Sequence, residues 1–115
     1  MVSCGVDIVS IKRFCFLMEK YGVRFLERVF AQEEIGICES KKNKVECFAG
    51  KFAAKEAVIK ALDLKGIPLK DIQVLSSNGK PILKVKGDLL CSVSISVSHE
   101  REYAVAMCVY TEEEV

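Results

Sequence analysis

The first third of the chain opens with alternating hydrophobic and polar residues and then changes to helical spacing. Hydrophobic side chains alternate along residues 2–9, which predicts an opening β-strand. Ser10 is a suitable N-cap for a helix that begins at Ile11 and ends near Gly22. Residues 25–30 again carry apolar side chains at helical spacing, so a second helical stretch is expected after the glycine.

The middle of the chain predicts two more helices separated by a basic loop. A short helix is expected at residues 32–39, and the polar segment 40–44 contains three lysines. The long helix spans residues 45–62; it has no proline and is rich in alanine, both of which favour helix. Residues 65–68 read Lys-Gly-Ile-Pro and end it.

The last third predicts antiparallel strands. Residues 72–75 and 82–86 flank the segment 76–81, whose Asn-Gly pair is typical of a hairpin turn. A second hairpin is expected, with strands at 92–98 and 103–109 joined by a turn at 99–102. Helices therefore come early and antiparallel strands late, which is the arrangement of an α+β fold.

Length and composition limit the size and the partners of the protein. The 115 residues are enough for one domain, 1–115. Half of them are hydrophobic, so we expect part of the surface to face another subunit. With 17 basic and 16 acidic residues, the chain lacks the basic excess of a nucleic-acid-binding protein. No segment resembles a signal peptide or reaches the ~20 apolar residues of a membrane span, so we expect a cytoplasmic protein without membrane contacts. The acidic segment 112–114 predicts a solvated end.

The cysteine pattern gives no sign of a metal site. No two cysteines form a CxxC pair, and the chain has one histidine. Most of the cysteines have apolar neighbours, so we expect small buried thiols in a reducing compartment. The six residues are Cys4, Cys15, Cys38, Cys47, Cys91 and Cys108.

Glu56 falls on the apolar side of the long helix, where a helical wheel puts it between Phe52 and Ala49. A buried carboxylate without a partner is costly, so Glu56 must be paired, protonated or bound to a metal ion. An ordinary ion pair with Lys60, one turn away in the favoured order, is one alternative.

Four further residues are candidates for binding or catalysis. Lys51 and Lys55 lie one turn apart and repel each other unless an anion such as phosphate lies between them; the alternative is that both extend into solvent. Asp7 interrupts the opening strand, and it either bonds to the following helix or supplies a second carboxylate for a hard cation such as Mg²⁺. His99, at a hairpin, is either structural or in contact with a phosphate or a base.

Three segments in order make the sequence similar to a known family. Residues 5–9 (Gly-Val-Asp-Ile-Val), 48–57 (Phe-Ala-Gly-Lys-Phe-Ala-Ala-Lys-Glu-Ala) and 96–100 (Ser-Val-Ser-His-Glu), with Tyr103-Ala104 after them, resemble the holo-acyl-carrier-protein synthases. These are small, single-domain 4′-phosphopantetheinyl transferases. The resemblance implies an α+β fold with a compact antiparallel sheet and a long helix, and a homotrimer with three active sites at subunit interfaces.

The resemblance also implies the reaction and the roles of individual residues. Phosphopantetheine is expected to pass from coenzyme A to a serine of apo acyl carrier protein, for fatty acid biosynthesis. Asp7 and Glu56 would hold Mg²⁺ with the coenzyme A pyrophosphate, and Lys60 would lie near the transferred phosphate. Together with Lys55, the positions expected to contact coenzyme A are Lys42, Lys44, Lys51, Asn78, Gly79, Lys80, Pro81 and His99. His99 is expected to come from a neighbouring subunit.

The resemblance further assigns a surface to the acidic carrier protein. The residues at that surface are Arg13, Arg24, Phe25 and Arg28. Two features depart from the family pattern: Lys51 stands where arginine is common, and residues 62–67 replace a more glycine-rich loop. A non-enzymatic coenzyme A or nucleotide-binding module and a purely structural trimer are the competing hypotheses.

Overall fold

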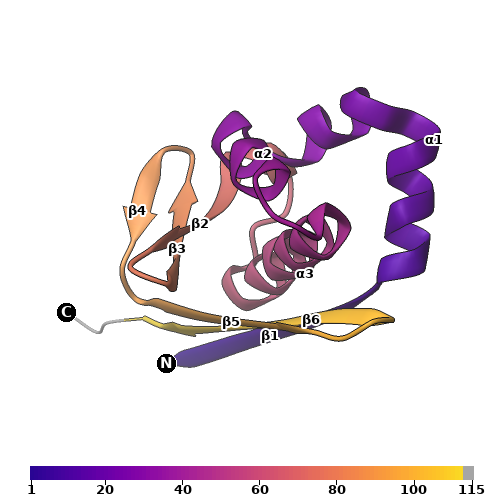
Figure 1. The fold of residues 1–115 in the computed structure, drawn as a ribbon. Helices are drawn as coiled ribbons and strands as arrows, with labels where there is room; N and C mark the ends of the chain where they lie inside the picture. The colour runs from indigo at the N-terminus through magenta and orange to yellow at the C-terminus, as the bar shows by residue number, and fades with distance from the viewer. Residues whose placement is uncertain (113–115) are drawn as a thin grey trace.

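Residues 1–112 are described by a computed structural model of the chain; the predicted acidic end at 112–114 lies mostly outside them. Within these residues, one strand is followed by three helices and then by five strands, which is an α+β fold, as predicted (Figure 1). The elements are β1 (Val2–Ser10), α1 (Ile11–Val29), α2 (Gln32–Glu39), α3 (Lys44–Leu62), a 3₁₀ turn (Leu69–Asp71), β2 (Ile72–Ser77), β3 (Lys80–Val85), β4 (Asp88–Leu90), β5 (Val93–His99) and β6 (Tyr103–Thr111). The 3₁₀ turn and β4 were not predicted.

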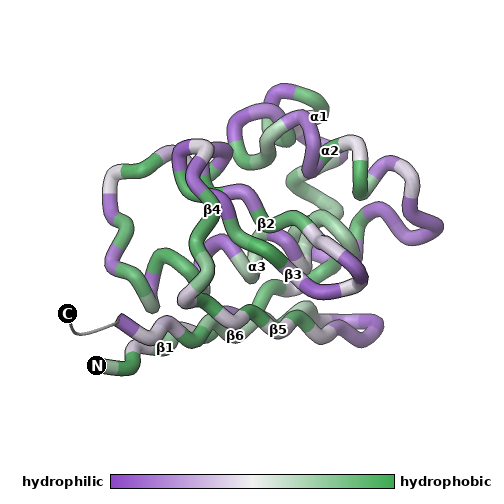
Figure 2. The backbone as a smooth tube through the Cα atoms, turned by 90° about the vertical axis from the view of Figure 1, so that its left-hand side faces the viewer, coloured by the Kyte–Doolittle hydropathy of each residue, from purple (hydrophilic) through white to green (hydrophobic). Residues whose placement is uncertain are grey.

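The first sheet joins the two ends of the chain. Its order is β1-β6-β5, and both pairings are antiparallel, so the opening strand lies beside the last one. The sequence predicted the β5–β6 hairpin but not the partner of β1. Helix α3 covers one face of this sheet, and no element of residues 1–112 covers the other (Figures 1 and 2).

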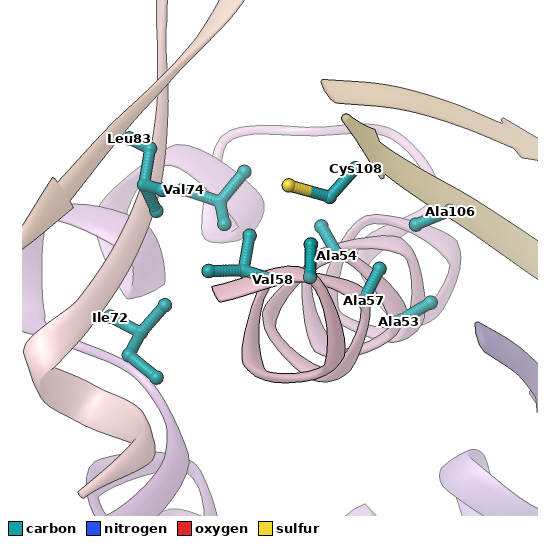
Figure 3. Packing of buried hydrophobic residues seen from close by; sticks show 10 residues of the cluster. Ala53, Ala54, Ala57, Val58, Ile72, Val74, Leu83, Ala106 and Cys108 are labelled. Atoms are coloured by element: carbon teal, nitrogen blue, oxygen red, sulfur yellow. The ribbon is translucent and has the colours of Figure 1, made fainter. Parts of the chain in front are cut away.

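Small residues bring α3 unusually close to the sheet. A Cβ atom added at Gly5 of β1 would collide with the Ala57 carbonyl oxygen and lie 2.9 Å from the Ala61 amide nitrogen. Ala57 and Ala53 point from α3 toward Ala106 of β6 (Figure 3). Since no side chain separates β1 from α3, their backbones are in direct contact. Asp7, two residues beyond Gly5 on the same face of the strand, is therefore carried to the side of the helix.

The second sheet has the order β2-β3-β4 and packs against another side of α3. Val58 of the helix faces Ile72, Val74 and Leu83 of this sheet (Figure 3). The predicted turn at 76–81 is shorter than expected, because pairing continues to Ser77 and Lys80. The two turn residues have positive φ, 52° at Asn78 and 80° at Gly79, which is why this position favours Asn-Gly. The two predicted hairpins thus belong to different sheets.

The first half of helix α1 ends at Gly22, as predicted. Gly22 has φ 61° and ψ −144°, values that break the helical path and redirect residues 23–29. Ser10 caps the helix by accepting a hydrogen bond from the Arg13 amide. The two halves pack on α3 through an aromatic cluster of Phe14, Phe25, Phe30, Phe48 and Phe52. Among residues 1–112, no helix combines the length and the apolar character of a membrane span.

The cysteine prediction is wrong for most of the six residues. Cys38 of α2 and Cys47 of α3 form a disulfide, because the short loop between the helices folds their ends together. Cys4 and Cys91 are exposed and Cys15 is half-buried. Cys108 alone is a buried free thiol, and its burial raises its pKa to about 11. Alternating strands expose one face, so apolar neighbours in sequence do not imply burial.

Candidate active site

Two carboxylates and one ammonium meet where β1 crosses α3. Asp7 projects from the strand, and Glu56 and Lys60 project from successive turns of the helix. The Lys60 ammonium donates to the Val6 carbonyl oxygen at 2.8 Å and lies 3.3 Å from an Asp7 carboxylate oxygen. The predicted alternative, an ion pair of Lys60 with Glu56, is replaced by this pair with Asp7. The Lys60 side chain remains about half exposed, so it can still contact a ligand.

Glu56 is a half-buried carboxylate close to a second negative charge. Burial raises its pKa, the charge of Asp7 raises it further, and Lys60 opposes both effects. Two carboxylates that destabilise each other in this way favour a cation between them. Residues 1–112 bring no group of three or more His, Cys, Asp or Glu side chains together as a metal site. The remaining ligands of such a cation would have to be water and the oxygens of a substrate.

A groove of about 600 Å³ opens beside the start of α3. Its walls come from the loop between α2 and α3, the first turns of α3, β2, the β2–β3 turn and the end of β5. Five predicted coenzyme A contacts line it: Lys42, Lys51, Gly79, Pro81 and His99. Among the other lining residues, Lys41 and Glu46 are charged and were not predicted. The only indication of Lys41 in the sequence was its position next to Lys42, which was predicted to contact coenzyme A.

Charged side chains from different elements meet in this groove. The Lys51 ammonium donates to the Val74 carbonyl oxygen, and burial lowers the Lys51 pKa. His99 Nδ1 lies 3.3 Å from a Glu46 carboxylate oxygen, so the end of β5 is tied to the first turn of α3. The groove therefore offers ammonium groups from a loop and a helix, and the imidazole of His99 from a strand, to one ligand.

Four predicted contacts lie outside the groove. Lys44 forms an exposed ion pair with Glu39 at 3.0 Å. Asn78, in the β2–β3 turn, and Lys80, at the start of β3, do not line the cavity. The prediction for Lys55 is wrong. Its side chain is fully buried, and its ammonium lies 2.6 Å from Glu34. The anion near the two lysines is thus a carboxylate of the chain, and Lys55 reaches neither phosphate nor solvent.

The groove and the carboxylate pair lie on opposite edges of the first sheet. Val97 and His99, in the groove, belong to β5, whereas Asp7 belongs to β1, and β6 separates the two strands. One chain therefore does not bring Lys51 and His99 to its own Asp7 and Glu56.

A second cavity, of about 360 Å³, lies on the second half of α1. Three residues of the predicted carrier-protein surface, Arg24, Phe25 and Arg28, line it together with Tyr21. Arg13 lies on the same helix but outside the cavity, on the other side of the break at Gly22. Tyr21 was not predicted, although helical spacing of 100° per residue places it within about 60° of Arg24, Phe25 and Arg28.

Known proteins resemble the chain over nearly its whole length. The family described as the 4′-phosphopantetheinyl transferase superfamily matches residues 3–108. A holo-[acyl-carrier-protein] synthase of Halothermothrix orenii is 41% identical over 116 residues, covering 91% of this chain and 93% of that protein.

Solved structures of two such enzymes resemble the chain in fold. The holo-[acyl-carrier-protein] synthase of Neisseria meningitidis has a TM-score of 0.86 at 30% identity and covers 97% of this chain and 100% of that one. The Helicobacter pylori enzyme, solved in complex with coenzyme A, has a TM-score of 0.82 at 32% identity, with 94% and 99% covered. In sequence and in fold, the chain belongs to the 4′-phosphopantetheinyl transferase superfamily.

Proposed function

We propose that this chain is a holo-[acyl-carrier-protein] synthase. It transfers 4′-phosphopantetheine from coenzyme A to a serine of apo acyl carrier protein and releases adenosine 3′,5′-bisphosphate. The observation that carries this proposal is the near full-length similarity to proteins of that name, one of them solved with coenzyme A. We take residues 1–115 as a single transferase domain.

The groove suits the nucleotide half of coenzyme A. Lys41, Lys42 and Lys51 can neutralise phosphate, and His99 lies on the same wall. Gly79 and Pro81 give a flat, uncharged wall at the β2–β3 turn, which suits a base. Glu46 is the one carboxylate among the lining residues, and its side chain contacts His99.

The residues Asp7 and Glu56 fit Mg²⁺, because both are carboxylates and each destabilises the charge of the other. When bound, Mg²⁺ would spread the negative charge of the diphosphate. The Glu56 carboxylate takes the proton of the attacking serine hydroxyl. Lys60 neutralises charge that develops on the transferred phosphate.

We propose a homotrimer with shared active sites. Along β1 and β6 the uncovered face of the first sheet is apolar, and its exposed residues include Val6, Ile8, Tyr103, Val105 and Met107. A contiguous apolar face of this kind is typical of a subunit interface. The separation of the groove from Asp7 within one chain supports the same assembly, since a neighbour would supply the missing half. We place this activity in the cytoplasm and in fatty acid biosynthesis, because the proposed protein substrate is an acyl carrier protein.

Incubation with coenzyme A, Mg²⁺ and an apo carrier protein tests the proposed function. The carrier is expected to gain about 340 Da, the mass of phosphopantetheine, and to do so only when the divalent cation is present. Mass spectrometry of the intact carrier gives the result. Nucleotide binding without a mass gain would favour the non-enzymatic binding module, and a trimer that does neither would favour the structural role.

Arg24→Glu is expected to raise the KM for carrier protein about tenfold or more and to leave the KM for coenzyme A unchanged. Arg24 lies with Arg28 at the second cavity, so reversing its charge repels an acidic partner. Steady-state kinetics with each substrate varied in turn gives both constants. Arg101→Glu, the same charge reversal at an exposed turn, is the control. An unchanged carrier KM for Arg24→Glu would reject the docking surface.

A further inference from the structure

A fully buried ion pair lies beneath the groove. The Glu34 carboxylate of α2 and the Lys55 ammonium of α3 are 2.6 Å apart, and neither side chain has exposed surface. A buried pair is stable only when its other hydrogen-bonding positions are also satisfied. Glu34 accepts the Val74 amide at 3.0 Å, and Lys55 donates to the carbonyl oxygens of Leu69, at 2.9 Å, and Ile72.

These contacts close the free edge of β2. This strand is at the edge of its sheet, where backbone N–H and C=O groups have no partner strand. The carbonyl oxygens of Ile72 and Val74 accept from Lys55 and Lys51, one turn apart on α3. Two successive lysines of the helix thus hold two carbonyls that are two residues apart in the strand. The Glu34 carboxylate holds the amide between them.

Val74 connects this pair to the groove. Its N–H is held by buried Glu34, its carbonyl oxygen holds the Lys51 ammonium, and Val74 and Lys51 both line the groove wall. An ammonium has three N–H donors, so Lys51 keeps two for a ligand after the bond to Val74. The position of these donors is therefore set by how firmly Val74 is held.

Charge balance gives Glu34 a second effect on Lys51. Burial lowers the pKa of Lys51, the negative charge of Glu34 raises it, and Lys41 lowers it further. Lys55 has a lowered pKa through burial and is likewise favoured in its charged form by Glu34. One carboxylate between two ammonium groups leaves a single positive charge, and Lys51 is the member of the three that faces the groove.

We propose that Glu34 is a positioning residue for coenzyme A: through Val74 and Lys55 it fixes the Lys51 ammonium in the groove to receive a phosphate of the nucleotide half. The identity of the ligand rests on the proposed function. Glu34 is fully buried and touches no substrate, so its effect on binding has to pass through Lys51.

Calorimetric titration with adenosine 3′,5′-bisphosphate tests this coupling. Glu34→Gln is expected to weaken nucleotide binding about tenfold while the KM for carrier protein stays unchanged. In a chain that already carries Lys51→Met, Glu34→Gln is expected to have no further effect, because the two residues act in series. Glu33→Gln, the same neutralisation at the exposed preceding residue of α2, is the control and is expected to bind normally.

Two further measurements cover the case in which Glu34→Gln does not fold because Lys55 is left unpaired. The neutral double variant Glu34→Gln/Lys55→Met removes both buried charges, is expected to fold, and should show the same loss of nucleotide affinity. In the unaltered protein with ¹⁵N-labelled lysine, the bisphosphate is expected to shift the ammonium signals of Lys51 and Lys55 together and to leave Lys44 unchanged.

Full nucleotide affinity in either folded variant, additive losses in the Lys51→Met background, or a shift confined to Lys51 would overturn the proposal. Nucleotide binding is measured without turnover. An unaltered chain that binds the bisphosphate but modifies no carrier would therefore contradict the proposed function and leave the Glu34 result to be judged separately.

Discussion

Glu56→Gln is expected to lower the rate of phosphopantetheine transfer by about a thousandfold or more, with the fold unchanged. The amide cannot accept the serine proton and is a poor ligand for Mg²⁺. It also removes the repulsion from Asp7 that raises the pKa of Glu56, so the protein should be at least as stable as before. Single-turnover transfer measured by mass, together with thermal unfolding, gives both results.

The control for this variant is Asp88→Asn, which neutralises an exposed carboxylate on β4. It is expected to leave transfer and stability unchanged. Calorimetric titration with Mg²⁺ separates the two roles of Glu56, since a ligand for the cation loses affinity when it becomes glutamine and a base alone does not. Near-normal turnover by Glu56→Gln would remove this residue from the site.

Met107→Glu is expected to abolish assembly and to reduce transfer about a hundredfold or more. Met107 lies on the uncovered face of the first sheet and is 46% exposed in the single chain. At a trimer axis the substitution would bury several like charges in an apolar contact, which costs several kcal/mol. Sedimentation velocity should then show a mass near 12.8 kDa, that of one chain, in place of three.

Leu89→Glu provides the comparison, because Leu89 is similarly exposed, at 53%, but lies on the second sheet. It should sediment and transfer like the unaltered protein. A Met107→Glu protein that still assembles would place the interface elsewhere. A fully active monomer would contradict the shared site, because the groove and Asp7 are on opposite sheet edges within one chain.

Local pattern was enough to predict most of the elements. Helix α2 has the predicted bounds, and α3 differs by one residue at its start. The break at Gly22 and the Asn78-Gly79 turn were predictable, because glycine or asparagine is favoured where φ is positive. The unusual positions of Asp7 and Glu56 were also visible in the local pattern, because each residue interrupts a periodic series of apolar side chains.

Long-range contacts could not be predicted in this way. The pairing of β1 with β6 joins residues about a hundred positions apart, and no local signal specifies it. The partner of Lys55 is Glu34, which reads in sequence as an ordinary acidic residue in the first turn of a helix. The sequence correctly indicated that two lysines one turn apart need an anion between them. The anion is the Glu34 carboxylate and not a phosphate.

The contact of Gly5 with α3 has a consequence for how the chain is aligned. A shift of β1 by one residue would place Cys4 or Val6 against the Ala57 carbonyl, and a shift by two would place Ser3 or Asp7 there. All four carry a Cβ atom, for which this position has no room. Gly5 thus fixes the register of β1 against α3. The same register fixes the distance between Asp7 and Glu56 in every folded molecule.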